Sequence, residues 1–119
     1  MSLNNEIKEK ICAASGGHPG MIKALMRLAK NQDNIKKMEN VDWVTDFFKQ
    51  RTITDECEKI WLGLGREEKQ TLLAPFNGEK IIDRSVVDLL KLKGILKDNG
   101  FFSPFFDSYL RSGKAKIKA

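Results

Sequence analysis

The segment with the clearest chemical potential is Gly16-Gly17-His18-Pro19-Gly20, which contains three glycines, a proline and the single histidine of the chain. A proline is well accommodated in the first turn of a helix, where backbone N–H groups have no partner within the helix. A helix start of this kind can present N–H groups and a flat proline face to a ligand. The same residues also fit a tight turn between two helices, so both interpretations stay open.

Other common kinds of reactive site are missing from the sequence. No segment reads GxxxxGK followed by Ser or Thr, because Gly78-Glu79-Lys80 lacks the first glycine and the hydroxyl. One histidine and no nucleophile elbow leave no catalytic triad or dyad. Cys12 and Cys57 form no CxxC pair, so we expect them to be reduced and structural. We therefore expect neither an autonomous enzyme nor a metal site.

The positive charge is concentrated at one end of the chain. The 119 residues carry a formal charge of +5, and the part beyond Glu79 contains nine basic and four acidic residues, which accounts for the whole excess. Such a concentration favours phosphate or acidic partners, although an ordinary solvated surface can look the same. We expect residues 113–119 to be a disordered basic tail. The basic residues that lie in patterned sequence, and can form a fixed surface, are Arg84, Lys91, Lys93 and Lys97.

Hydrophobic runs are short throughout the chain. None approaches the roughly 20 apolar residues that cross a bilayer, and the first residues lead straight into a charged segment rather than a signal peptide. We therefore expect a cytoplasmic protein without a membrane partner.

The first part of the chain has the apolar spacing of a small helical bundle over residues 4–50. Helices are predicted over 4–14, where Ser15-Gly16-Gly17 ends the pattern, and over 19–30. Residues 31–40 are polar and predict a connector or a short helix, and a further helix is expected to begin near 40–42.

The second part, residues 54–112, predicts three helices, a hairpin and a closing helix. Thr54 is expected to cap the first helix, which ends at Gly63 to Gly65, and the second runs from Arg66 to Asn77-Gly78. Asp83 or Ser85 is expected to cap the third, which ends at Gly94. Its predicted apolar side consists of Val86, Leu89, Leu90 and Leu92.

Asn99-Gly100 between two short apolar segments predicts a tight hairpin. Ser103-Pro104 then predicts the start of a final helix, with Ser103 as its N-cap. We expect this helix to bury Phe105, Phe106, Tyr109 and Leu110. The order of elements is that of a winged helix-turn-helix, so the predicted fold is mainly α, a small helical bundle followed by a winged helix with a two-stranded β wing.

Two stretches resemble known proteins. GGHPGMIKALMRLAK is similar to the lid segment of AAA+ and STAND-class P-loop ATPases, whose Gly-x-Pro turn opens a helix beside the adenine nucleotide. The stretches IWLGLGREEKQTLLAPF and VVDLLKLKGILKDNGFFSPFFDSYLR resemble the winged-helix domain that follows the lid in many of those proteins. Together they cover nearly the whole chain in the order found in the family.

The resemblance implies the C-terminal lid and winged helix of a larger ATPase, without its P-loop domain. It places Gly17, His18 and Pro19 beside the ATP or ADP held by that upstream domain, with Pro19 facing the adenine or ribose. Arg27, the only arginine of the second helix, is the candidate phosphate sensor. The fragment itself then needs no cofactor and is not an enzyme, whereas the parent protein is expected to bind ATP.

The winged helix is open to two interpretations. The resemblance implies a switch or interaction element that packs against the upstream ATPase domain. The alternative is a DNA-binding module of the transcription-regulator type, whose third helix enters the major groove while the wing contacts a phosphate. Its candidate contacts to duplex DNA are Arg84, Ser85, Lys91, Lys93 and Lys97, opposed by Asp83, Asp88 and Asp98. A third interpretation, phenylalanines as anchors for a protein partner, competes with their expected place in the core.

Overall fold

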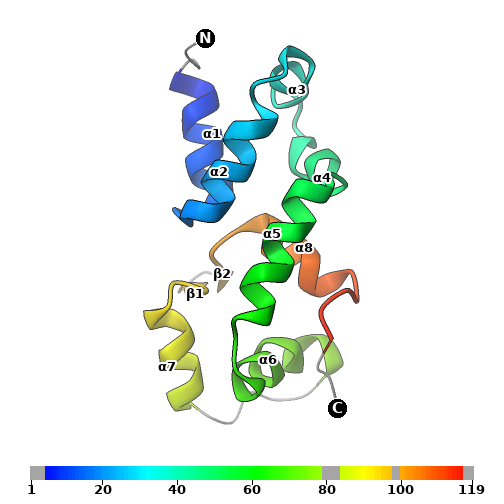
Figure 1. The fold of residues 1–119 in the computed structure, drawn as a ribbon. Coiled ribbons are helices and arrows are strands. Elements are labelled where there is room, and N and C mark those ends of the chain that lie inside the picture. The colour runs from blue at the N-terminus through cyan, green and yellow to red at the C-terminus, as the bar shows by residue number, and fades with distance from the viewer. Residues whose placement is uncertain (1–4, 79–83, 98–99, 117–119) are drawn as a thin grey trace.

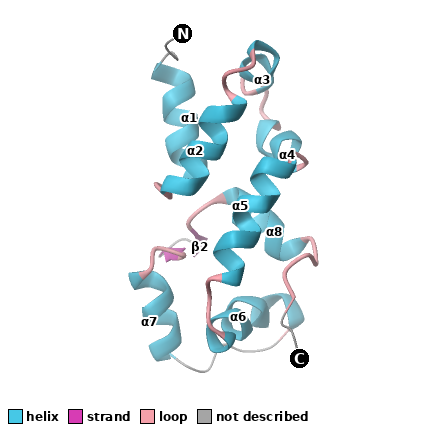
Figure 2. Ribbon diagram, in the orientation of Figure 1, coloured by secondary structure: helices cyan, strands magenta, loops and turns pink. Residues whose placement is uncertain are grey.

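The computed structural model describes residues 5–78, 84–97 and 100–116. Within these ranges the chain forms eight α-helices, one 3₁₀ helix and a two-stranded antiparallel sheet (Figures 1 and 2). The molecule is elongated, with extents of 47 × 24 × 23 Å. The prediction of a mainly helical fold with a small β-hairpin is confirmed.

The first four helices agree closely with the sequence pattern. Their bounds are α1 (Asn5–Ser15), α2 (Pro19–Leu28), α3 (Gln32–Lys37) and α4 (Trp43–Phe48). Pro19 occupies the first turn of α2, as predicted. The polar connector contains the short helix α3, which is capped by Asn31 through a hydrogen bond from the backbone N–H of Asp33.

The second half contains four helices, a 3₁₀ turn and the hairpin. Their bounds are α5 (Arg51–Leu62), α6 (Arg66–Leu73), η1 (Ala74–Asn77), α7 (Arg84–Leu92), β1 (Leu96–Lys97), β2 (Gly100–Phe101) and α8 (Pro104–Arg111). The two antiparallel strands of the predicted hairpin are confirmed, with Leu96 opposite Phe101, whereas Asp98 and Asn99 of the predicted tight turn lie outside the described residues. The hydroxyl of Ser103 accepts a hydrogen bond from the Phe105 N–H, which confirms the predicted cap of α8.

Thr54 is not a helix cap, contrary to the sequence prediction. Helix α5 begins three residues earlier, and Thr54 lies inside it and donates its hydroxyl to the carbonyl of Arg51 at 3.1 Å. The apolar side of α5 begins before Thr54, because Ile53, Cys57 and Trp61 recur at a spacing of four residues and are all buried. That continuous buried face extends the helix across the predicted boundary.

The helix predicted from Arg66 to the break at Asn77-Gly78 ends early. Helix α6 stops at Leu73 and continues as the 3₁₀ turn η1, because Pro75 has no N–H for the next helical hydrogen bond. Gly78 then closes the turn with a φ of 73°. Phe76 is consequently 36% exposed and stacks on Phe101 with ring centroids 6.1 Å apart.

Helix α7 buries less of its apolar side than predicted. Val86 and Leu90 are buried, but Leu89 is 43% and Leu92 is 85% exposed. The helix packs on α6 and β1, and the hairpin is too short to cover the remaining leucines. Ser85 lies within the first turn of α7 rather than at its cap, and Asp83, the other predicted cap, lies outside the described residues.

A single buried cluster extends through both predicted units. Helix α5 runs down the middle of the molecule and contacts α2, α4 and α8 (Figure 1). Helices α1 and α4 also contact α8. The buried side chains range from Ile7 in α1 to Ala115 beyond α8. The ranges 4–50 and 54–112 therefore share a hydrophobic core.

The α1–α2 turn packs directly on the end of the hairpin. Gly16 has a φ of 62°, and a Cβ atom at this position would lie 2.1 Å from the carbonyl oxygen of Phe102. The hydroxyl of Ser103 donates a hydrogen bond to the carbonyl of Ala14. These contacts join the end of α1 to the start of α8.

The segment after α8 folds back on the helices. The indole Nε1 of Trp61 donates to the carbonyl of Lys116 at 3.1 Å, and Ala115 is buried. The ammonium of Lys114 lies 5.4 Å from the ring centroid of Phe48. Residues 113–116, predicted to belong to a disordered tail, are thus packed, because Trp61 needs a partner for its buried N–H. Residues 117–119 lie outside the described residues.

None of the helices in the described ranges has the length and apolar character needed to span a bilayer.

The two glycines before His18 provide a matched pair of substitutions. We expect Gly16→Ala to lower the free energy of unfolding by several kcal/mol. The positive φ costs an alanine about 1–2 kcal/mol, and the clash of its Cβ with the backbone of Phe102 adds to that cost. Gly17→Ala should lose only the energy of placing an alanine at a positive φ, since no atom lies within 4 Å of the position that its Cβ would take. Urea denaturation followed by circular dichroism measures both, and equal losses would contradict the close approach of Gly16 to Phe102.

Candidate functional site

The Gly16–Gly20 turn uses most of its N–H groups internally. The N–H of Gly17 donates to the Ser15 hydroxyl at 3.2 Å, and that of His18 donates to the Ser15 carbonyl at 3.1 Å. The Met21 N–H donates to the Nδ1 of His18 at 3.2 Å. The expectation that this helix start presents several N–H groups to a ligand is therefore not met. Gly17 and Pro19 are nevertheless exposed, so the proline face stays open to solvent.

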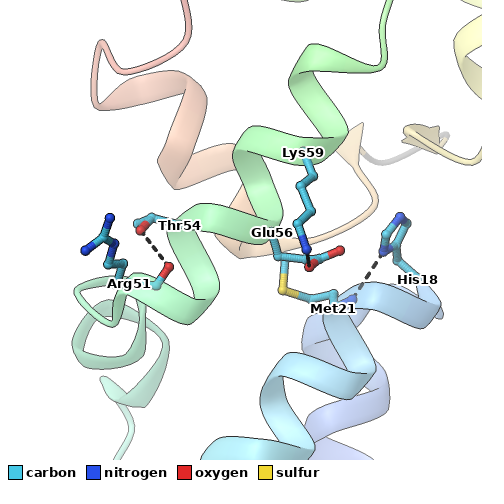
Figure 3. A network of polar contacts seen from close by, with 6 residues as sticks. All are labelled: His18, Met21, Arg51, Thr54, Glu56 and Lys59. Carbon is cyan, nitrogen blue, oxygen red and sulfur yellow. Dashed lines mark hydrogen bonds and ion pairs between the residues drawn. The ribbon is translucent and has the colours of Figure 1, made fainter.

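His18 is held in place as the N-cap of α2. Its Nδ1 accepts the Met21 N–H, and its ring lies 5.7 Å from the ring of Phe102, tilted by 42° (Figure 3 shows the hydrogen bond). A Cβ atom on Gly20 would lie 3.2 Å from the His18 ring and 2.0 Å from Glu56 Oε1. Gly20 thus allows the carboxylate of α5 to approach the start of α2 beside the imidazole.

A groove of about 400 Å³ runs between α2 and α5 from this point. The α2 wall consists of Gly20, Lys23, Ala24 and Arg27, and the α5 wall consists of Thr52, Asp55, Glu56 and Lys59. Seven residues of helix separate Gly20 from Arg27, about 10 Å along the axis. Arg27 therefore lies two helical turns away from Pro19. Of the predicted nucleotide-binding residues, Arg27 lines the groove, and Gly17, His18 and Pro19 do not.

The acidic side chains that line the groove have ion-pair partners, whereas two of its basic side chains do not. Both acidic side chains of the α5 wall are engaged, Glu56 with Lys59 at 3.6 Å and Asp55 with Arg51 at 3.8 Å (Figure 3 shows the first pair). Within the described residues, Lys23 and Arg27 take part in no ion pair. The sequence prediction does not include the α5 wall, because it begins the helix at Thr54, although the spacing of 52, 55, 56 and 59 marks one face of a helix.

The candidate DNA contacts do not form one basic surface. Arg84, Ser85 and Lys91 are exposed on α7, and Lys97 is exposed on β1. By helical geometry, Asp88 lies at the middle of the exposed side of α7, opposite the buried Val86 and Leu90, with Arg84 on one side of it and Leu92 on the other. The remaining candidate, Lys93, is engaged in a contact within the protein.

Lys93 pairs with the buried carboxylate of Glu68. The ammonium donates to Oε1 at 2.8 Å, and the same oxygen accepts the Gly65 N–H at 2.8 Å, so that Glu68 satisfies one backbone N–H at the start of α6. The Glu68 side chain is 7% exposed. Burial alone would raise the pKa of Glu68, but the hydrogen bonds from Lys93 and Gly65 and the charge of Lys93 outweigh it, so the pKa is lowered.

The cysteines differ in environment. Cys12 is exposed, whereas Cys57 is buried in α5. Burial, with a smaller effect of the neighbouring Glu56, raises the pKa of the Cys57 thiol to about 12, so this thiol stays protonated at neutral pH. The described part of the chain contains no cluster of His, Cys, Asp and Glu side chains that would hold a metal ion.

No protein-family model, curated protein or solved structure matches this chain.

The Glu68–Lys93 pair predicts a pH-dependent contribution to stability. A lowered carboxyl pKa stabilises the fold fully above the ordinary glutamate pKa of 4.5, and the contribution is lost as the pH falls through the lower pKa of the folded state. We expect Glu68→Gln to cost about 1–2 kcal/mol at pH 7, since Lys93 is half exposed. The difference from the wild type should shrink below pH ~4.5.

Glu67→Gln is the matched control, because Glu67 neighbours Glu68 in the first turn of α6 but is exposed. Chemical denaturation over a pH series measures both variants. A loss of stability in Glu68→Gln no greater than in Glu67→Gln would contradict the structural role of the pair.

Proposed function

We propose that the chain is the regulatory lid and winged-helix module of a P-loop ATPase of the AAA+ or STAND type. Residues 4–50 act as the lid, which contacts adenine nucleotide held by an upstream domain of the same polypeptide. Residues 54–112 act as a winged helix that transmits the nucleotide state. The module itself performs no catalysis, and ATP or ADP is the cofactor of the parent protein.

The observation that carries this proposal is the construction of the Gly16–Gly20 turn. Its glycines and His18 are fixed by internal contacts, while the ring of Pro19 faces solvent at the start of α2. A rigid apolar face next to a few polar groups suits the base or sugar of a nucleotide. Arg27, without an ion-pair partner among the described residues, supplies a positive charge on the same helix.

The attachment of this turn to the hairpin supports a switch. Gly16 touches the backbone of Phe102, the ring of His18 contacts the ring of Phe102, and Ser103 bonds to Ala14. A ligand that shifts the turn therefore acts on the end of the hairpin and on the start of α8. Two arrangements of such a packed junction would give the module its two states.

The succession α5, α6, α7, hairpin and α8 supports the winged-helix assignment. DNA binding is the weaker use of that fold here. Asp88 holds the middle of the exposed side of α7, between Arg84 and Leu92, and places a negative charge where phosphate and base contacts would need donors. Lys93, one of the few basic residues available, already neutralises Glu68.

The lid assignment is tested in the polypeptide that includes the proposed P-loop domain. We expect Pro19→Ala and Arg27→Ala each to weaken ATP or ADP binding by roughly tenfold, the effect of losing one good contact. Calorimetric titration measures the dissociation constants. Lys30→Ala is the control, because Lys30 is exposed just after α2 and outside the groove. Unchanged nucleotide binding in both lid variants would overturn the assignment.

The DNA-binding alternative is tested on the 119-residue chain alone. We expect no micromolar binding of a fluorescent duplex in anisotropy titrations at physiological salt, because too few basic side chains face one surface. Micromolar binding with a steep salt dependence would favour the alternative, provided that Arg84→Glu with Lys97→Glu abolishes it. These positions are chosen because they leave the Glu68–Lys93 pair intact.

A further inference from the structure

Helix α7 has a broad apolar side, only part of which is covered. Val86 and Leu90 face the protein and are 7% and 0% exposed. Leu89 and Leu92 face outward, and Leu92 at 85% exposure is almost entirely in solvent. The helix lies at the periphery of the molecule, where another chain can reach it (Figure 1). A helix whose apolar side is wider than the surface that covers it is typical of one that packs on two neighbours.

The outward side has the pattern of a coiled-coil seam. Leu89 and Leu92 are three residues apart, as the a and d positions of a heptad are. In that register Asp88 occupies the g position and Lys93 the e position. These are the positions whose charges pair between parallel helices, g of one chain with e of the other. The seam is therefore complementary in charge to a copy of itself.

We propose that two copies of this chain associate through α7, with the two helices parallel about a two-fold axis. Leu89 and Leu92 of each copy pack on the same residues of the other, and Asp88 of each copy lies beside Lys93 of the other. The ammonium of Lys93 has three donors, so the contact with Glu68 leaves capacity for a second carboxylate. The association is independent of nucleotide and uses the side of α7 that DNA binding would need.

The size of α7 sets the strength of this association. Nine residues span about 13 Å, far less than the three or four heptads of an independent coiled coil. The interface is thus smaller than that of a standard stable complex, and the dimer is weak and reversible. Its dissociation constant falls between roughly 1 µM and 1 mM.

Sedimentation equilibrium over that concentration range tests the proposal. The wild-type chain should pass from monomer to dimer, and Leu92→Lys should raise the dissociation constant at least about tenfold. The exposure of Leu92 means that this change leaves the fold intact, which circular dichroism verifies. Val41→Lys is the matched control, because Val41 is 97% exposed and lies between α3 and α4. A monomer at every concentration, or an equal effect of both variants, overturns the proposal.

Cysteine cross-linking tests the parallel orientation. In a parallel pair, residue 92 of one copy meets residue 92 of the other, so Leu92→Cys in a Cys12→Ser background should give a covalent dimer under mild oxidation. Cys57 is buried and does not interfere. Val41→Cys in the same background should remain monomeric. Equal cross-linking of the two variants, or none at position 92, would contradict the parallel seam.

Discussion

The arrangement of the whole molecule depends on the close approach of the α1–α2 turn to the end of the hairpin. Gly16 touches the backbone of Phe102, which no residue with a Cβ atom allows. Beside it, the Ser103 hydroxyl donates to the carbonyl of Ala14 and accepts the N–H of Phe105. One side chain thus satisfies a carbonyl at the end of α1 and an N–H at the start of α8, two groups that helix ends leave without partners.

Helix α5 makes that junction part of a single core. It crosses the boundary that the sequence suggested at Thr54, so the same rigid rod contacts α2 and α4 on one side of the boundary and α8 on the other. A rod shared in this way transmits displacement better than a flexible linker does. It also creates the α2–α5 groove, which joins a wall from the first predicted unit to a wall formed by Asp55, Glu56 and Lys59 of the second and by Thr52 just before it.

Local signals in the sequence predict local structure well, whereas tertiary contacts escape them. Pro19 and Ser103 mark the starts of α2 and α8 correctly, because caps and turns depend on a few adjacent residues. The prediction that Thr54 caps α5 is wrong, since the burial of Ile53 extends the helix back to Arg51. The candidate site shows the same limit. The approach of Glu56 to Gly20, which builds the second wall of the groove, joins residues 36 positions apart and is set by the packing of α5 on α2.

The net charge of +5 is a poor guide to the partner because several cations of the basic third already make contacts within the protein. Lys93 neutralises the buried Glu68, and Arg111 bonds to Asp107 at 2.9 Å. Lys114 lies over an aromatic ring of α4. A phosphate backbone would have to compete with these contacts. The two cations of the α2 wall, outside the strongly basic third, meet no ion-pair competitor among the described residues. Two cations without an ion-pair partner in the described part of the chain therefore lie on the helix that begins at the proposed nucleotide-facing turn.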